Sequence, residues 1–156
     1  MSATRYWLFK SEPESYSISD LRRDGKTLWD GVRNYQARNL LRDDMRVGDG
    51  VLFSHSNVHP PAIVGTARII RAGVPDPTQF DPDHPKFDPK ATPVHPRWYA
   101  VDIAFVEEFA APISLESLRD IPALAGMELL RRGSRLSVQP VTPAQWTVIL
   151  RLAQAS

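Results

Sequence analysis

A proline-rich segment divides the chain and limits the folds open to it. Seven of the 14 prolines lie between Pro75 and Pro96. Proline breaks helices and removes a backbone donor from a strand, and no periodic pattern survives across residues 73–97. We therefore predict a long loop here. A structureless loop of this length in a compact domain is usually functional, for example as a lid.

Short strands and short helices are predicted on both sides of this loop. The strand-like runs are residues 6–10, 51–55, 62–70 and 98–105, with a short extended stretch at 137–139. Helices are indicated at 17–24, 34–44, 115–121, 124–130 and 142–153, several of them by cap residues such as Ser17 and Thr142. Strands mixed with short helices indicate an α+β fold or a small mixed barrel. A doubly wound sheet does not fit, because strands and long helices do not alternate.

Length and composition exclude several classes of protein. The 156 residues suit one domain, 1–156, that buries roughly 70% of its unfolded surface. No cysteine is present, so disulfides, iron–sulfur clusters and thiol nucleophiles are excluded. No apolar run approaches the ~18 residues of a membrane span. The four apolar residues 6–9 are too few for a signal-peptide core. We expect a cytoplasmic monomer that does not contact membranes.

Charge is unevenly distributed although the net charge is only +1. Residues 1–71 carry 11 Lys/Arg and 8 Asp/Glu, residues 72–110 carry 3 and 7, and residues 111–156 carry 5 and 3. A basic face beside an acidic flap is compatible with polyanion binding. An ordinary solvated surface explains the same distribution equally well. A strongly basic, histone-like binder is excluded.

Patterns that would indicate catalysis or metal binding are weak. No glycine-rich phosphate loop is present. His55 and His59 have helical metal-ligand spacing, but they lie at a predicted strand end before two prolines. Ser54 and His55 are neighbours in a strand and point to opposite faces, so adjacency provides no proton relay. We therefore expect no enzyme, no metal site and no cofactor.

Among the four tryptophans, Trp29 differs from the others. Trp7, Trp98 and Trp146 lie in strand or helix patterns typical of a core. Trp29 follows a glycine-ended helix and precedes Asp30-Gly31, which predicts a loop position. An exposed indole gives a flat face on which a nucleobase can stack. The alternative is that Trp29 covers the end of the barrel.

Polar residues near Trp29 and near the strand ends could complete a base-binding pocket. Asn and Ser can both donate and accept hydrogen bonds, and Arg can bind a phosphate or a base edge with two hydrogen bonds. The pocket candidates are Lys10, Ser11, Asn34, His55 and Ser56. The phosphate or base-edge candidates are Arg33, Arg38 and Arg135, each of which is otherwise an ordinary surface residue.

Long blocks of the sequence resemble the EVE domain family, which has animal and small bacterial members. The blocks occur in family order over nearly the whole chain, at residues 6–13, 29–39, 47–49, 53–57, 63–65, 75–81, 96–98 and 133–141. The resemblance implies a PUA-like mixed β-barrel with short peripheral helices, related to the PUA, ASCH and YTH domains.

The resemblance also implies a function. YTH domains hold a methylated adenine in an aromatic cage, and EVE domains are implicated in recognising modified cytosine. Trp29 falls where a cage tryptophan would lie, and Ser11 and Asn34 fall near base-contacting positions. Ser54 departs from the family, which has an aromatic residue there. The candidates for a further pocket wall are Phe80, Phe87 and Trp98.

These observations predict a nucleic-acid-binding module that holds a modified base, such as a modified cytosine, in DNA or RNA and consumes nothing. The near-neutral charge predicts few phosphate contacts. Two alternatives remain. One is an enzyme acting on a nucleotide or modified base, with His55 as acid or base and residues 73–97 as its lid. The other is a small-molecule or protein-binding module. The loop position of Trp29 predicts that Trp29→Ala abolishes base binding with little loss of stability.

Overall fold

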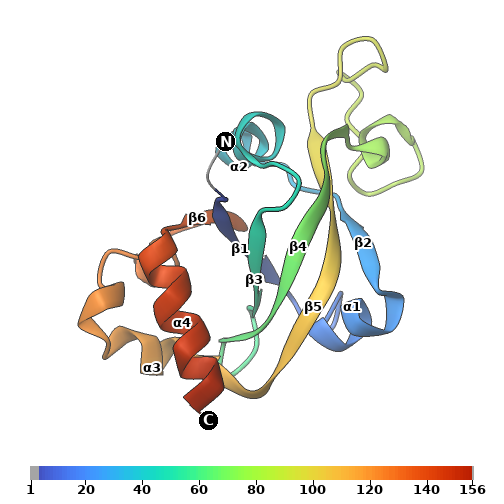
Figure 1. The fold of residues 1–156 in the computed structure, drawn as a ribbon. Helices are drawn as coiled ribbons and strands as arrows, with labels where there is room; N and C mark the ends of the chain where they lie inside the picture. The colour runs from blue at the N-terminus through green and yellow to red at the C-terminus, as the bar shows by residue number, and fades with distance from the viewer. Residues whose placement is uncertain (1–3, 156) are drawn as a thin grey trace.

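The computed structural model describes residues 4–155, so residues 1–3 and 156 of the expected 1–156 domain lie outside it. Within that range one mixed sheet has the strand order β2-β5-β4-β3-β1-β6 (Figure 1). The strands are β1 (Tyr6–Ser11), β2 (Lys26–Trp29), β3 (Gly50–His55), β4 (Ala62–Pro75), β5 (Tyr99–Ser114) and β6 (Val138–Val141). β1 and β3 pair in parallel and the other neighbours pair antiparallel. The expected α+β fold is confirmed.

Short helices lie on both faces of the sheet. They are α1 (Ile18–Asp24), α2 (Tyr35–Asn39), α3 (Leu115–Arg119) and α4 (Pro143–Ala155). A π-helical turn follows α2 at Leu40–Asp44, and 3-10 turns occupy Pro77–Phe80, Pro122–Leu124 and Glu128–Leu130. Among the described residues, none of the helices combines the length and apolar character needed to cross a bilayer. The capping box at Ser17 is confirmed, because its side chain accepts from the Asp20 N–H while Asp20 accepts from the Ser17 N–H.

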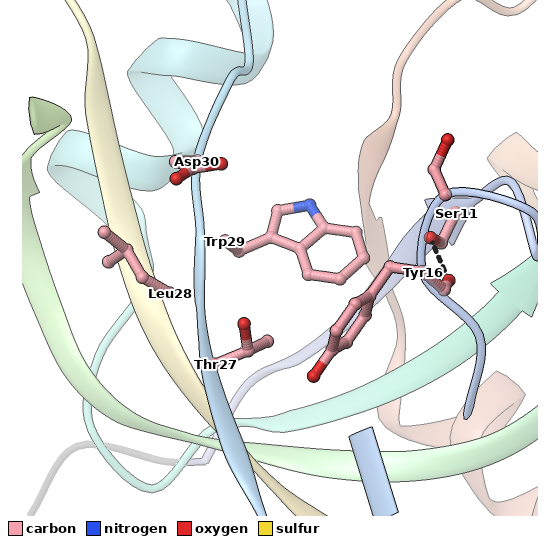
Figure 2. A pocket seen from close by; sticks show the side chains of 7 residues that line it. Ser11, Tyr16, Thr27, Leu28, Trp29 and Asp30 are labelled. Atoms are coloured by element: carbon pink, nitrogen blue, oxygen red, sulfur yellow. Dashed lines mark hydrogen bonds between the residues drawn. The ribbon is translucent and has the colours of Figure 1, made fainter. Parts of the chain in front are cut away.

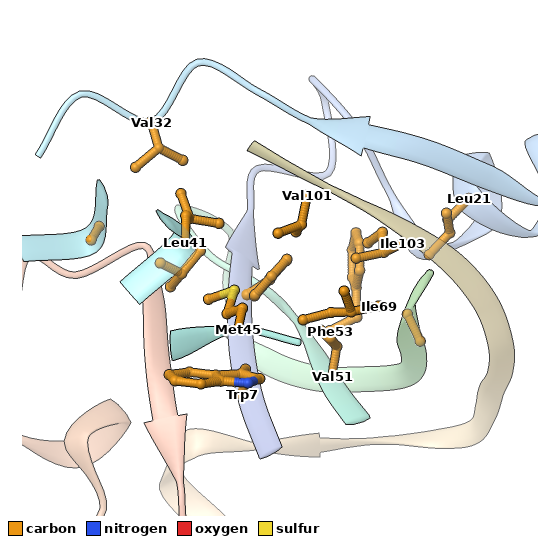
Figure 3. Packing of buried hydrophobic residues seen from close by; sticks show 14 of the residues in the cluster. Trp7, Leu21, Val32, Leu41, Met45, Val51, Phe53, Ile69, Val101 and Ile103 are labelled. Carbon is orange, nitrogen blue, oxygen red and sulfur yellow. The ribbon is translucent and has the colours of Figure 1, made fainter. Parts of the chain in front are cut away.

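Two hydrophobic clusters occupy opposite faces of the sheet because strand residues alternate in direction. Phe9 and Phe53 face the first cluster, under α1 and α2 (Figure 3). Leu8 and Leu52 face the second, under α3 and α4. The sheet is therefore covered on both sides, and the ends of β1 and β3 emerge between the two clusters.

β4 and β5 are longer than predicted. β4 continues to Pro75 and β5 to Ser114, and the two strands pair along most of their length with several register shifts. The sequence prediction ended this strand at residue 70, where the run rich in β-branched residues ends and Gly73 follows. Pairing with β5 keeps that part extended, and Pro75 lies opposite Tyr99. The proline-rich segment thus leaves and re-enters the sheet at adjacent positions.

The prediction of a loop at Trp29 was wrong, because residues 26–29 form the edge strand β2. Gly25 ends α1 with a φ of 79°, a conformation that favours glycine, and its carbonyl accepts from the Phe105 N–H. This turn delivers the next four residues onto β5, where Trp29 lies opposite Val101. A strand of four residues is too short to show alternation, so no local pattern predicted it.

Candidate functional site

A cavity of about 360 Å³ opens beside Trp29, between β2 and the segment that joins β1 to α1 (Figure 2). Its size falls within the range of roughly 300–1,000 Å³ typical of small-ligand sites. It is lined by Ser11, Ser15, Tyr16, Thr27, Leu28, Trp29 and Asp30. Two aromatic rings and a rim of hydroxyls and a carboxylate thus meet in one hollow.

The Trp29 indole is half-buried and rests on the first hydrophobic cluster. Its ring centroid lies 5.2 Å from that of Phe9 and 5.6 Å from that of Phe53, which meets it edge-on. Behind Phe53 the strand has a bulge, and the Ser54 side chain turns inward to donate to the Ala62 carbonyl at 3.2 Å. Trp29 is therefore both a pocket wall and part of the packing, which the predicted loop position did not allow for.

Tyr16 supplies the second aromatic group of the cavity, and the sequence analysis missed it. Its ring lies close to the indole in Figure 2. Its hydroxyl donates to the Asp24 carboxylate at 2.8 Å. Partial burial raises the pKa of Tyr16, and Asp24 raises it further. The available signal was position: Tyr16 immediately precedes the cap residue Ser17 and belongs to no apolar periodicity.

The polar groups at the rim of the cavity differ in burial and in hydrogen bonding. The buried Ser11 hydroxyl donates to the Tyr16 carbonyl, which holds the β1–α1 segment in place along one side of the cavity. Asp30 is exposed at the rim. Partial desolvation raises the pKa of its carboxyl, and the neighbouring Asp76 adds to this, although His84 and Arg33 act in the opposite direction.

A second cavity of about 480 Å³ lies on the other face of β1. It is lined by Lys10, Glu12, Ser56, Asn57, Arg135, Leu136 and Ser137. Lys10 and Ser11 are adjacent in β1 and therefore point to opposite faces. The structure thus separates the predicted pocket residues: Ser11 and Trp29 line the first cavity, whereas Lys10, Ser56 and Arg135 line the second. Burial lowers the pKa of Lys10, and Glu128 counteracts this.

Two further predicted pocket residues have local structural contacts instead. The Asn34 side chain accepts from the Ala37 N–H at 3.0 Å and caps α2. The His55 Nε2 accepts from the Ile18 N–H at 3.1 Å, at the start of α1. Burial lowers the pKa of His55, although Glu108 opposes the shift. Neither side chain lines the Trp29 cavity or the Lys10 cavity.

Arg33 and Arg38 are also engaged within the protein. The Arg33 guanidinium is 18% exposed and donates to Asp76 at 3.0 Å. It also donates to the Thr78 hydroxyl and the Lys86 carbonyl. Arg38 lies over the Tyr35 ring and donates to a main-chain carbonyl of the proline-rich segment at 2.9 Å. Both cations tie the region around α2 to the proline-rich segment.

The proline-rich segment is more ordered than the sequence indicated. Buried Asp76 accepts from Gly31 N–H, Arg33 and the Thr78 amide and hydroxyl. Buried Gln79 donates to the Asp76 and Trp98 carbonyls and accepts from the Arg97 and Trp98 N–H groups. These polar side chains tie the segment to itself and to the chain just after Trp29. The segment therefore packs against that turn and supports it, and we call residues 73–97 the brace.

The three candidates for a further pocket wall lie outside the Trp29 cavity. Trp98 is buried and stacks on Tyr35 with ring centroids 4.8 Å apart, and its indole N–H donates to Asp88 at 2.7 Å. Phe80 ends the 3-10 turn of the brace and Phe87 lies further along it. Across residues 4–155 no group of three or more His, Asp or Glu gathers in a way that could hold a metal ion.

The model of the EVE domain family matches residues 5–152. The chain belongs to the EVE domain family. Thymocyte nuclear protein 1 of Rattus norvegicus is 42% identical over 97% of this chain and 75% of the relative. A Pseudomonas putida protein of known crystal structure is 51% identical with a TM-score of 0.91, covering 95% of this chain and 99% of that one.

A human relative adds information on the ligand of another EVE domain protein. Human THYN1 protein was crystallised in complex with 5-methylcytosine containing DNA. It is 38% identical to this EVE domain with a TM-score of 0.90, and the match covers 97% of this chain and 98% of that one. A TM-score of 0.90 over so much of both chains means that the two proteins share the fold.

Proposed function

We propose that this EVE domain is a reader that binds one modified base of a nucleic acid in the Trp29 cavity without chemically changing it. The observation that carries the proposal is the pairing of Trp29 and Tyr16 in one open cavity with a polar rim. The human relative crystallised with 5-methylcytosine containing DNA supports the same ligand class.

The cavity has the properties that a flipped base requires. Extruding a base from a duplex costs a few kcal/mol, and less from a single strand. Stacking on an aromatic side chain returns about 1–3 kcal/mol per base. The contacts of Trp29 with Phe9 and Phe53 hold the indole in place before the ligand arrives, so little side-chain entropy is lost on binding.

The Lys10 cavity is suited to a phosphate of the same strand. Lys10 and Arg135 line it, and within residues 4–155 the exposed Arg135 side chain has no hydrogen bond or ion pair. The Ser56 N–H donates to the Ser11 carbonyl at 2.9 Å, so the ends of β1 and β3 are tied together between the two cavities. A nucleotide bound across this end could place its base on one face and its phosphate on the other.

The enzyme alternative has less support from the geometry. His55 was its candidate acid or base, but its Nε2 already accepts from the Ile18 N–H and its ring lies edge-on to Phe53. The side chain does not line the Trp29 cavity. A base bound there would not meet this imidazole.

The test is a binding titration with single-stranded oligonucleotides that differ at one central base. Unmodified cytosine, 5-methylcytosine, 5-hydroxymethylcytosine and N6-methyladenine would be compared, with affinity measured by anisotropy of a labelled oligonucleotide. We expect one modified base to bind best. Trp29→Ala and Tyr16→Ala should each weaken binding by at least about tenfold, since each removes a stacking partner.

The matched control is Trp146→Phe. Trp146 stacks on Tyr6 with ring centroids 4.4 Å apart, on the face of the second hydrophobic cluster. Its replacement should leave affinity unchanged. A folded wild-type protein that binds none of the oligonucleotides would overturn the proposal. Equal loss in the Trp146 and Trp29 variants would show that the cavity is misassigned.

A further inference from the structure

Asp30 is the one acceptor-only side chain among the residues that line the Trp29 cavity. The hydroxyls of Ser11, Ser15 and Thr27 can both donate and accept, and the Trp29 indole N–H only donates. Groups that can do both adapt to either pattern on a base edge. A carboxylate cannot, so it is the lining group best able to distinguish one edge from another.

The Asp30 carboxylate accepts a hydrogen bond from its own backbone N–H. Within residues 4–155 it makes no hydrogen bond or ion pair to another side chain, although Asp24 and Asp76 nearby both do. Desolvation and the neighbouring Asp76 raise the pKa of Asp30, so the charged carboxylate is poorly stabilised in the free protein. A hydrogen-bond donor brought by a ligand would supply the missing partner.

We propose that Asp30 accepts a hydrogen bond from the exocyclic amine of the bound base and so selects bases that carry one. This rests on the proposed base-binding function of the Trp29 cavity. Cytosine presents its N4 amine as a donor, and Asp and Glu are the side chains that accept from it. Thymine and uracil present an O4 acceptor at the same position, which would face the carboxylate with no proton between them.

5-Methylcytosine and thymine make a sharp test of this proposal. They have the same ring size and the same 5-methyl group, so stacking on Trp29 and Tyr16 is nearly equal for the two. They differ in the position-4 substituent and in whether N3 accepts or donates. Cytosine and uracil repeat that difference without the methyl group. An effect of Asp30 should therefore appear in both pairs, whereas an effect on methyl packing would appear in neither.

The experiment measures the affinity of oligonucleotides with a central 5-methylcytosine, thymine, cytosine or uracil for the wild type, Asp30→Asn and Asp30→Ala. We expect the wild type to prefer the amino-bearing base in each pair by about tenfold or more. Asp30→Ala should reduce both preferences to near unity. Asp30→Asn should reduce them partly, because an amide can either accept or donate.

Asp120→Asn is the control, because this exposed aspartate ends α3 beyond the second hydrophobic cluster. It should leave both preferences unchanged. Melting temperatures of the Asp30 variants should match the wild type, since no bond to another side chain within residues 4–155 is lost. Preferences that survive in Asp30→Ala, or a wild type that binds thymine as well as 5-methylcytosine, would overturn the role of Asp30 but leave the reader intact. A wild type that binds no oligonucleotide would overturn the reader itself.

Discussion

Asp30 and Asp76 lie close to the same turn of the chain after Trp29, yet the protein treats them in opposite ways. Asp76 is fully buried and accepts from the Gly31 N–H at 2.7 Å, from Arg33 at 3.0 Å and from Thr78. Asp30 is exposed at the rim of a cavity and has no partner side chain within residues 4–155. The Asp76 carboxylate is thus fully bonded within the protein (a closed group), whereas the Asp30 carboxylate remains accessible to a ligand (an open group).

The pKa shifts of the two carboxyls reflect this difference. Burial alone would raise the pKa of Asp76, but hydrogen bonds from Thr78, the Gly31 N–H and Arg33 outweigh it and lower the pKa. Around Asp30 desolvation dominates and the pKa is raised. Polar groups that are satisfied internally hold the scaffold, whereas a carboxylate beside a cavity that lacks a side-chain partner within residues 4–155 marks where a ligand can add a bond.

The largest effect that this comparison predicts is on stability in Asp76→Ala. Removing the carboxylate takes the anionic partner from the largely buried Arg33 guanidinium and the acceptor from the Gly31 N–H. We expect a loss of about 3–5 kcal/mol in the free energy of unfolding, measured by urea denaturation. Oligonucleotide affinity should also fall, because Gly31 lies two residues after Trp29.

Asp83→Ala is the matched control for that measurement. Asp83 is an exposed aspartate of the same proline-rich segment. Its replacement should change stability by no more than about 0.5 kcal/mol. If Asp76→Ala and Asp83→Ala unfolded at the same urea concentration as the wild type, the proline-rich segment would not act as a brace.

The next largest effect is expected in Trp29→Ala, which should lower stability as well as binding. The indole contacts Phe9 and Phe53 but remains half-exposed. We expect a loss of about 2–3 kcal/mol, below the 3–5 typical of a buried aromatic. Trp29→Phe should retain most of the stability. A thermal melt of Trp29→Ala equal to that of the wild type would show that the indole lines the cavity without contributing to the packing.

The comparison also explains what the sequence could and could not predict. Local signals predicted the caps at Ser17 and Asn34 and most strands. Trp29 and Ser11, two of the predicted pocket residues, line one cavity, and their role in binding a base stays a prediction. β2 and the far ends of β4 and β5 were missed because their pairing is non-local and their alternation is weak. Tyr16 and Asp30 were missed for a related reason: they belong to no periodic pattern, and only the fold brings them together.

The cations show the same contrast between closed and open groups. Arg33 was a candidate for a phosphate or a base edge, and in the structure its guanidinium donates to three groups of the brace. Arg135 is exposed beside Lys10 and has no such partners within the described residues. The alternation that sends Lys10 and Ser11 to opposite faces of β1 therefore also separates the proposed phosphate site from the base site.

Arg135→Ala should weaken oligonucleotide binding moderately and equally for all sequences. A phosphate contact carries no base information. We expect the slope of log affinity against log salt to fall by about 1 while the preference for 5-methylcytosine over thymine stays constant. Arg119→Ala, at an exposed arginine of α3, is the control and should change neither quantity. A changed base preference in Arg135→Ala would show that Arg135 contacts the base and not the phosphate.

The smallest predicted effect concerns His55, a titratable group whose ring nitrogen accepts a hydrogen bond from a backbone N–H. Burial lowers the pKa of folded His55 below the ~6.5 of an unfolded histidine. The unfolded state therefore binds more protons in the window just below pH 6.5, and stability should fall as the pH decreases through that window. Protonation would also oppose the bond that Nε2 accepts from the Ile18 N–H.

His55→Gln keeps an acceptor near the Ile18 N–H but cannot titrate. Thermal melts of both proteins between pH 7.5 and 5 should diverge below about pH 6.5, with the wild type losing more stability. Comparing the two removes the contribution of Asp30, whose raised pKa acts in the opposite direction and is common to both proteins. Parallel curves would mean that the pKa of His55 is the same in the folded and unfolded states. The contrast between Asp76, which is bonded within the protein, and Asp30 would then not include His55.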